Sequence, residues 1–119
     1  MRTILVVDDD PAAADGLRLL LGTDGYDASA EVDPERAIGR IAREAFDAVV
    51  TDLEMPHVHG VEVVRAARAA RPRAPIFVVS AYTDSPAAAQ AMEAGADGIF
   101  AKPLDYDVLA SELARLLAL

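Results

Sequence analysis

The chain has 119 residues, which is the usual size of one domain, so we expect a single domain over residues 1–119. Its 20 acidic and 11 basic residues give a net charge of −9, which argues against binding to nucleic acid or to an anionic membrane surface. There is no cysteine, which excludes disulfides, thiolate zinc sites and cysteine nucleophiles. Apolar runs are too short for a membrane span or a signal peptide, so we expect a cytoplasmic protein.

The first half of the chain begins with an apolar run at 4–7 that predicts a buried strand. Asp10 followed by Pro11 predicts a capped helix start, and Gly22 predicts its end. A weaker strand is predicted at 28–30. A second cap at Asp33, again followed by proline, then opens another helix.

The second half repeats this alternation of short apolar runs and amphipathic segments. In chain order we predict a strand at 48–50, a helix at 60–71, a strand at 76–79, a helix at 86–95, a strand at 99–101 and a helix at 106–117. Strict alternation of buried strands and helices favours an α/β sandwich of three layers, with a parallel sheet in the middle. Such sheets bind ligands beyond the carboxyl ends of their strands.

Polar residues gather at those predicted strand ends. They are Asp8, Asp9, Asp10, Asp52, Ser80 and Lys102. Clustered carboxylates repel one another, and a hard divalent cation such as Mg²⁺ compensates that repulsion. A lysine ammonium is suited to a phosphate oxygen. Asp10 has a simpler explanation as a helix cap.

A carboxylate can itself accept a phosphoryl group, and that chemistry needs positioning and charge neutralisation above all. Asp52 stands alone at a central strand end and is the favoured nucleophile, while Asp8 and Asp9 form the pair suited to metal. An alternative is an aspartate-nucleophile phosphatase of the haloacid dehalogenase type, because residues 8–10 also contain its D-x-D spacing. In that case Asp8 is the nucleophile, and the presence of Asp52 at the strand end is left unexplained.

The motifs together resemble the receiver domain of two-component response regulators over essentially the whole chain. The matching segments are ILVVDD at 4–9, DLEMP at 52–56, Gly60, VVSA at 78–81, GADG at 95–98 and KP at 102–103. The resemblance implies a doubly wound, five-stranded parallel sheet of order 2-1-3-4-5, the flavodoxin-like sandwich.

The resemblance also implies roles for individual residues. Asp52 accepts phosphate from a histidine kinase or histidine phosphotransfer protein. Ser80 and Lys102 each contact a phosphoryl oxygen. Mg²⁺ is held by Asp9, by Asp52, by the Glu54 backbone carbonyl and, mainly through water, by Asp8. The Lys102–Pro103 peptide bond is expected to be cis.

The chain departs from the family pattern at several places. Ile99 stands where the family usually has a tyrosine or phenylalanine that switches with Ser80, and strand alternation directs Ile99 and Phe100 to opposite faces. His59 replaces a commoner Asp or Asn, and no role is assigned to it or to His57. Glu54 and Tyr82 occupy places that tune phosphoryl lifetime in the family.

The resemblance also implies an output domain or target protein that binds at the fourth helix, the fifth strand and the fifth helix. Glu112 stands where DNA-binding members with winged-helix outputs usually carry an arginine, so their ion-pair dimer is not expected. We expect a signalling domain that acts only on its own phosphoryl group. A receiver-like binding module that never takes phosphate is a further alternative, supported only by Ile99.

Overall fold

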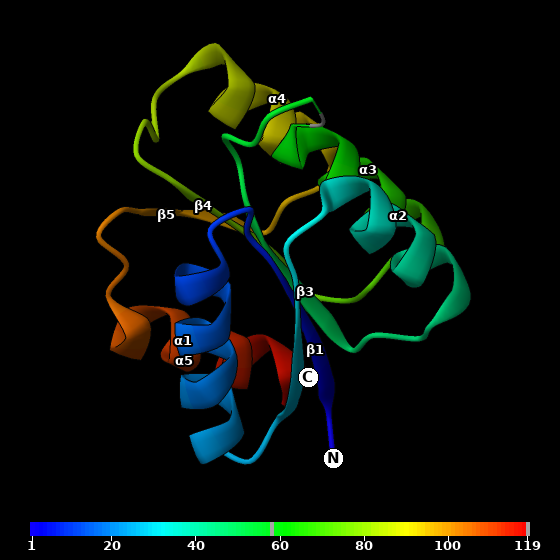
Figure 1. Ribbon diagram of the computed structural model, residues 1–119, viewed down its shortest axis with the longest axis vertical. Coiled ribbons are helices and arrows are strands. Elements are labelled where there is room, and N and C mark those ends of the chain that lie inside the picture. The colour runs from blue at the N-terminus through cyan, green and yellow to red at the C-terminus, as the bar shows by residue number, and fades with distance from the viewer. Residues whose placement is uncertain (58, 119) are drawn as a thin grey trace.

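The computed structural model describes residues 1–57 and 59–118. Its centre is a five-stranded parallel sheet in the order β2-β1-β3-β4-β5 (Figure 1). The strands are β1 (Thr3–Val7), β2 (Asp27–Glu31), β3 (Ala48–Asp52), β4 (Ile76–Ser80) and β5 (Gly98–Ala101). The helices are α1 (Pro11–Thr23), α2 (Pro34–Arg43), α3 (Gly60–Ala70), α4 (Pro86–Ala94) and α5 (Tyr106–Leu117). The predicted doubly wound α/β fold is therefore confirmed, including the strand order.

The weak strand predicted at 28–30 is a full edge strand, because all five of its residues pair in register with β1. The predicted end of α1 at Gly22 is wrong by one residue. The helix continues through Gly22 to Thr23, and the Asp24 amide closes its last turn on the carbonyls of Leu20 and Leu21. Chain reversal falls instead on Gly25, whose φ of 93° suits a residue without a side chain.

Local hydrogen bonds start four of the helices, as their sequences predict. The Asp10 carboxylate accepts a hydrogen bond from the Ala12 amide at the start of α1. The side chains of Asp33, Ser85 and Asp105 cap α2, α4 and α5 in the same way. The N-cap of α3 is His59, whose side chain makes no capping bond.

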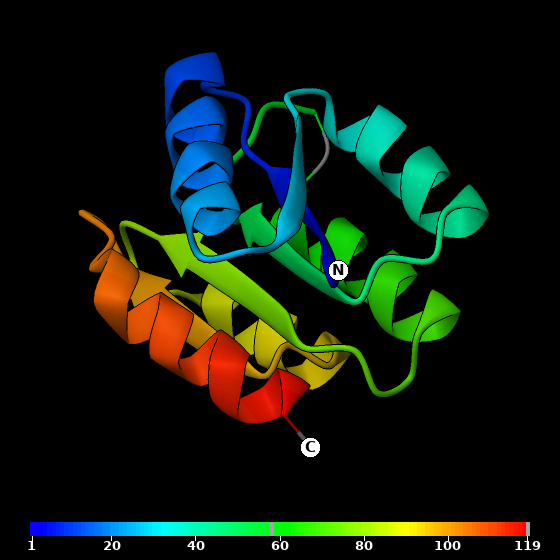
Figure 2. The same cartoon turned by 90° about the horizontal axis from the view of Figure 1, so that it is seen from below.

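Alternation along the strands divides the apolar core between the two faces of the sheet. Leu5, Val49 and Val78 pack beneath α2, α3 and α4, whereas Ile4, Val50 and Phe77 pack beneath α1 and α5. Figure 2 shows α1 and α5 side by side on their face of the sheet. Within residues 1–57 and 59–118, no helix is both long and apolar enough to cross a membrane.

The two residues at the centre of β5 face opposite layers, as the alternation predicts. Ile99 packs against the α2–α4 side of the core. Phe100 packs on the α1–α5 side, where its ring meets Phe77 edge-on at 5.1 Å. An aromatic side chain is thus present on β5, but it lies on the face away from the position that Ile99 occupies.

Arg68 on α3 joins four segments at the end of the sheet opposite the strand carboxyl ends. Its guanidinium donates to the Gly95 carbonyl at 2.6 Å, where α4 ends. It also donates to the carbonyls of Pro72 and Ala74 at 2.9 Å, and to the Asp97 carboxylate at 2.9 Å. One half-buried side chain therefore satisfies the carbonyl that ends α4 and two carbonyls of the loop before β4, and it pairs with the Asp97 carboxylate before β5.

Replacing Arg68 with Met should lower the free energy of unfolding by about 2–3 kcal/mol, because the aliphatic stem remains and the hydrogen bonds are lost. Urea denaturation gives the measurement. Arg65→Met on the same helix is the matched control, since Arg65 is exposed and pairs with Glu62 alone among the described residues. We expect less than about 0.5 kcal/mol there. Equal losses for the two variants would contradict the role assigned to Arg68.

Candidate functional site

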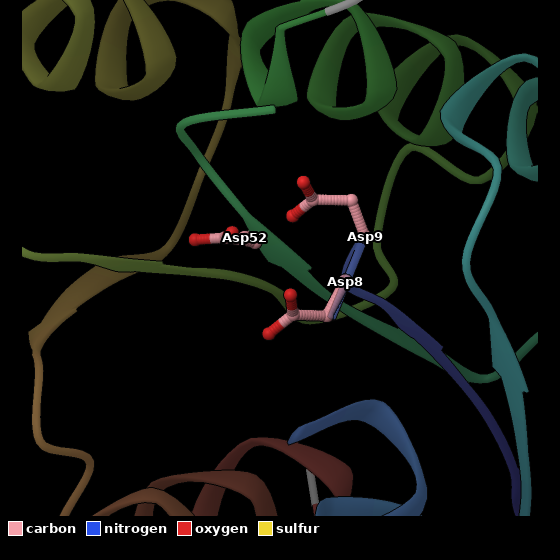
Figure 3. A group of neighbouring side chains, drawn as sticks. All are labelled: Asp8, Asp9 and Asp52. Atoms are coloured by element: carbon pink, nitrogen blue, oxygen red, sulfur yellow. The ribbon is translucent and has the colours of Figure 1, made fainter. Parts of the chain in front are cut away.

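Three carboxylates meet at the carboxyl ends of β1 and β3, the central pair of strands. Asp8 and Asp9 directly follow β1, and Asp52 is the last residue of β3. One oxygen from each carboxylate lies within 4.8 Å of the others. Figure 3 shows the three side chains around one shared space at this edge of the sheet. Their oxygens suit a hard divalent cation.

Asp10 does not join this group, although it is adjacent in sequence. Its side chain turns back to cap α1 through the Ala12 amide. The structure thus separates the acidic run at 8–10 into a helix cap and two members of the carboxylate group.

Asp52 is held at a defined orientation inside the protein, with only 4 % of its surface exposed. Its Oδ1 accepts hydrogen bonds from the Leu53 amide at 3.0 Å and from Lys102 Nζ at 2.8 Å. Among the described residues, no hydrogen bond reaches its Oδ2. Burial raises the pKa of Asp52 above its ordinary value, and the ammonium of Lys102 opposes that rise.

The pKa of Lys102 is raised like those of Asp8 and Asp52, but in a lysine a raised pKa favours the charged form. Burial lowers the pKa of Lys102, but the hydrogen bond to Asp52 and the charges of Asp52, Asp8 and Glu54 raise it overall. Lys102 therefore stays an ammonium at neutral pH, beside the most buried carboxylate of the group. The Lys102–Pro103 peptide bond that follows is cis.

Asp8 is the acid whose ionisation is most clearly disturbed. Burial raises its pKa to about 6, and the charges of Asp52 and Asp9 add to that rise. A hydrogen bond from the Asp10 amide and the charge of Lys102 act against it. The charged form of Asp8 is therefore disfavoured in the metal-free domain, first by burial and then by the neighbouring carboxylates.

The raised pKa of Asp8 predicts a pH dependence of stability in the absence of divalent cations. The folded-state pKa of Asp8 is about 6 against an ordinary value of 3.8, so the folded protein binds more protons than the unfolded chain between these values. Stability should therefore fall as the pH rises through that window. We expect Asp8→Asn to remove part of this slope and to stabilise the metal-free domain at pH 7 by about 1 kcal/mol, allowing for solvent screening.

Thermal unfolding in EDTA across that pH range provides the test. Asp15→Asn is the control, because Asp15 is an exposed acid on α1 paired with Arg18. A slope that Asp8→Asn leaves unchanged would show that Asp8 ionises normally in the folded domain.

Ser80 lies at the end of β4, beside β3, and is fully buried. Its hydroxyl donates to the Glu54 carboxylate, at 2.8 Å to Oε2 and 3.1 Å to Oε1. Sequence reasoning assigned Glu54 a backbone role in metal binding and a place that tunes phosphoryl lifetime, but it missed the contact of the Glu54 side chain with Ser80. The one sequence signal for this contact was that Glu54 follows the end of β3 and Ser80 ends β4, the neighbouring strand.

A pocket of about 360 Å³ adjoins the carboxylates on the side of α1 and α5. Asp8, Asp52 and Lys102 form one end of it, and side chains such as Leu17 and Tyr106 form the apolar remainder. The Tyr106 hydroxyl bonds Asp24 at 2.5 Å, which ties the start of α5 to the end of α1. Asp9 and Lys102 are exposed, so molecules approaching from outside the fold can reach the acidic site.

The fold and site define a doubly wound α/β domain with an acidic pocket at the switch point between its central strands. The family model of the response regulator receiver domain matches residues 4–114. The chain belongs to this family, and it is a receiver domain of two-component signalling. Response regulators receive their phosphoryl groups from histidine kinases.

Known relatives agree with this assignment. The chain is 33 % identical over 115 residues to the transcriptional regulatory protein ZraR of Salmonella typhimurium, which covers 97 % of the chain and 26 % of ZraR. The chain therefore spans about a quarter of the length of that relative.

Two solved structures are similar over nearly their full lengths. A CheY-like receiver domain protein from Methanospirillum hungatei JF-1 has a TM-score of 0.93 at 26 % identity, covering 99 % of this chain and 94 % of that one. The receiver domain of the sensor histidine kinase PA1611 from Pseudomonas aeruginosa PAO1 has a TM-score of 0.87 at 26 % identity, covering 99 % and 98 %. That domain carries a magnesium ion coordinated in its active-site cleft.

Proposed function

We propose that this domain accepts a phosphoryl group on Asp52 from a histidine kinase or a histidine phosphotransfer protein. The observation that supports it is the buried Asp52 carboxylate, whose Oδ1 is held by Lys102 and the Leu53 amide. This arrangement leaves Oδ2 to form the bond to phosphorus as the phosphorus–nitrogen bond of the donor phosphohistidine breaks. Lys102 then neutralises charge on a phosphoryl oxygen.

The carboxylate group fits Mg²⁺, since three oxygen donors lie within 4.8 Å of one another and repel one another without a cation. The magnesium ion in the PA1611 receiver domain supports the same choice. Asp9 and Asp52 would bind the ion directly, together with the Glu54 carbonyl, and Asp8 would act mainly through water. When bound, Mg²⁺ supplies neutralisation of negative charge on the transferring phosphoryl group.

Phosphate mapping tests the proposal. We expect acetyl phosphate with Mg²⁺ to label Asp52, and borohydride trapping followed by mass spectrometry to locate the label there. A label on Asp8 with Asp52 unlabelled would favour the haloacid dehalogenase type of phosphatase. No label at any acid would favour a binding module that takes no phosphate.

The environment of Asp8 argues against the phosphatase alternative. Asp8 Oδ1 accepts a hydrogen bond from the Asp10 amide at 3.0 Å, and the ammonium of Lys102 pairs with Asp52 at 2.8 Å. The positive partner that a phosphoryl acceptor requires is thus beside Asp52. The domain acts, in this proposal, only on its own phosphoryl group.

We also assign the readout of phosphorylation to the surface formed by α4, β5 and α5. Exposed apolar side chains lie on or beside these elements, including Tyr82, Met92 and Val108. Ser80 would move toward the phosphoryl group, and residues 81–85 and α4 would follow. Ile99 is half-buried in the core and has no ring to swing, so β5 would contribute little side-chain motion. An output domain or target protein would bind this surface.

A further inference from the structure

The Glu54 side chain is bound to the same segment that the proposed phosphoryl group would engage. Its carboxylate accepts the Ser80 hydroxyl at 2.8 Å and the Ala81 amide at 3.3 Å. The Tyr82 amide in turn donates to Ser80 Oγ at 2.9 Å. The ends of β3 and β4 and the first residues after β4 are therefore joined through one exposed acid and one buried hydroxyl.

A serine hydroxyl has only one proton to donate. While Glu54 holds that proton, Ser80 cannot donate it to any other acceptor. A phosphoryl oxygen on Asp52 would compete with Glu54 for the Ser80 hydroxyl, because both are anionic acceptors near the same donor. The two bonds are mutually exclusive.

We propose that Glu54 is a positioning residue that holds Ser80 and the loop after β4 in the resting arrangement, and that the phosphoryl group must displace it. This inference rests on the proposed phosphorylation of Asp52. It assigns the Glu54 side chain a role separate from that of its backbone carbonyl, since a side-chain substitution leaves the carbonyl in place. Displacement of Glu54 also frees the Ala81 amide, which couples acceptance of the phosphoryl group to release of residues 81–85.

The first test needs no phosphoryl group. Amide hydrogen exchange at Ala81 should quicken by about tenfold in Glu54→Ala, the effect of losing a hydrogen bond to a charged group. Exchange at Tyr82 should quicken less, because its acceptor Ser80 Oγ remains and loses only its own bond to Glu54. Glu54→Gln keeps an acceptor oxygen without the charge, so its amide exchange rates should lie between those of the wild type and of Glu54→Ala. Glu62→Ala removes an exposed acid on α3 that bonds Arg65, and should leave both amides unchanged. Unchanged exchange in Glu54→Ala would overturn the proposal.

The second test measures binding of beryllofluoride, a phosphoryl mimic, by calorimetry at saturating Mg²⁺. Glu54→Ala should bind it about tenfold more tightly than the wild type, and Glu62→Ala should match the wild type. The same substitution in a Ser80→Ala background separates competition for the hydroxyl from simple charge repulsion. In that background, Glu54→Ala should increase the affinity for beryllofluoride by less than about twofold, because no Ser80 hydroxyl remains to be released.

The outcomes separate this inference from the function on which it rests. A wild-type domain that does not bind beryllofluoride at all would contradict phosphorylation of Asp52. A wild type that binds it, with equal affinity in Glu54→Ala, would overturn the role of Glu54 alone. A tenfold gain that persists without Ser80 would also overturn it, since repulsion by the acid would then account for the whole effect.

Discussion

Phosphorylation by acetyl phosphate is expected to be undetectable in Asp52→Asn, while the variant stays folded. The amide is nearly the same shape as the carboxylate, and its oxygen can still accept from the Leu53 amide and from Lys102. It has no second carboxylate oxygen with which to form the phosphoryl bond. Intact-mass spectrometry measures the label, and Asp15→Asn on the exposed face of α1 should be labelled like the wild type.

The same variant should also change the response to Mg²⁺. A cation at about 100 times its dissociation constant should stabilise the wild type by about 2.7 kcal/mol. Asp52→Asn removes one of the three carboxylates and should lose most of that gain, whereas Asp15→Asn should retain it. Calorimetry with and without Mg²⁺ measures both. A wild-type melting temperature that Mg²⁺ leaves unmoved would show that the carboxylate group is not a metal site.

Gly60→Ala should strongly destabilise the fold where the start of α3 packs against the end of β3. A Cβ at this position would lie 2.3 Å from the Asp52 carbonyl oxygen and 2.8 Å from Leu53 Cα. Both are backbone atoms at the end of β3, so neither can rotate away. We expect a loss of about 3 kcal/mol in the free energy of unfolding and slower labelling of Asp52, because α3 and the end of β3 must separate.

Gly16→Ala is the matched control for that substitution. Gly16 lies inside α1, and an added Cβ would meet nothing within 4 Å. Since alanine is the better helix former, we expect a gain of about 0.5–1 kcal/mol. Urea denaturation of both variants gives the comparison. A loss at Gly60 no larger than about 1 kcal/mol would mean that α3 can shift without cost to the site.

Features of the fold that depend on neighbouring residues could be predicted directly. The caps at Asp10, Asp33, Ser85 and Asp105 form as expected, because a capping side chain bonds an amide two or three residues along the chain. The opposite directions of Ile99 and Phe100 follow from the twofold period of a strand. The wrong prediction that α1 ends at Gly22 also has a local cause, since a glycine permits a helix end without requiring one.

Part of the site followed from the same local signals. The alternation of strands and helices put Asp8, Asp9, Asp52, Ser80 and Lys102 at one edge of a parallel sheet, and the structure brings them there. The order of the strands did not follow from local pattern and came from the family resemblance. Any order of parallel strands would have preserved the periodicity of the core.

By itself, the sequence determined the alternating α/β architecture, the helix starts and the polar residues that end the strands, because each depends on spacing along the chain. Only the tertiary structure decided which of those polar groups touch. It directs the Ser80 hydroxyl to Glu54, 26 residues away, and Arg68 to Asp97, 29 residues away. It also brings Gly60 against the Asp52 carbonyl. No periodic sequence pattern predicts such contacts, because they depend on how the strands and helices pack in the folded chain.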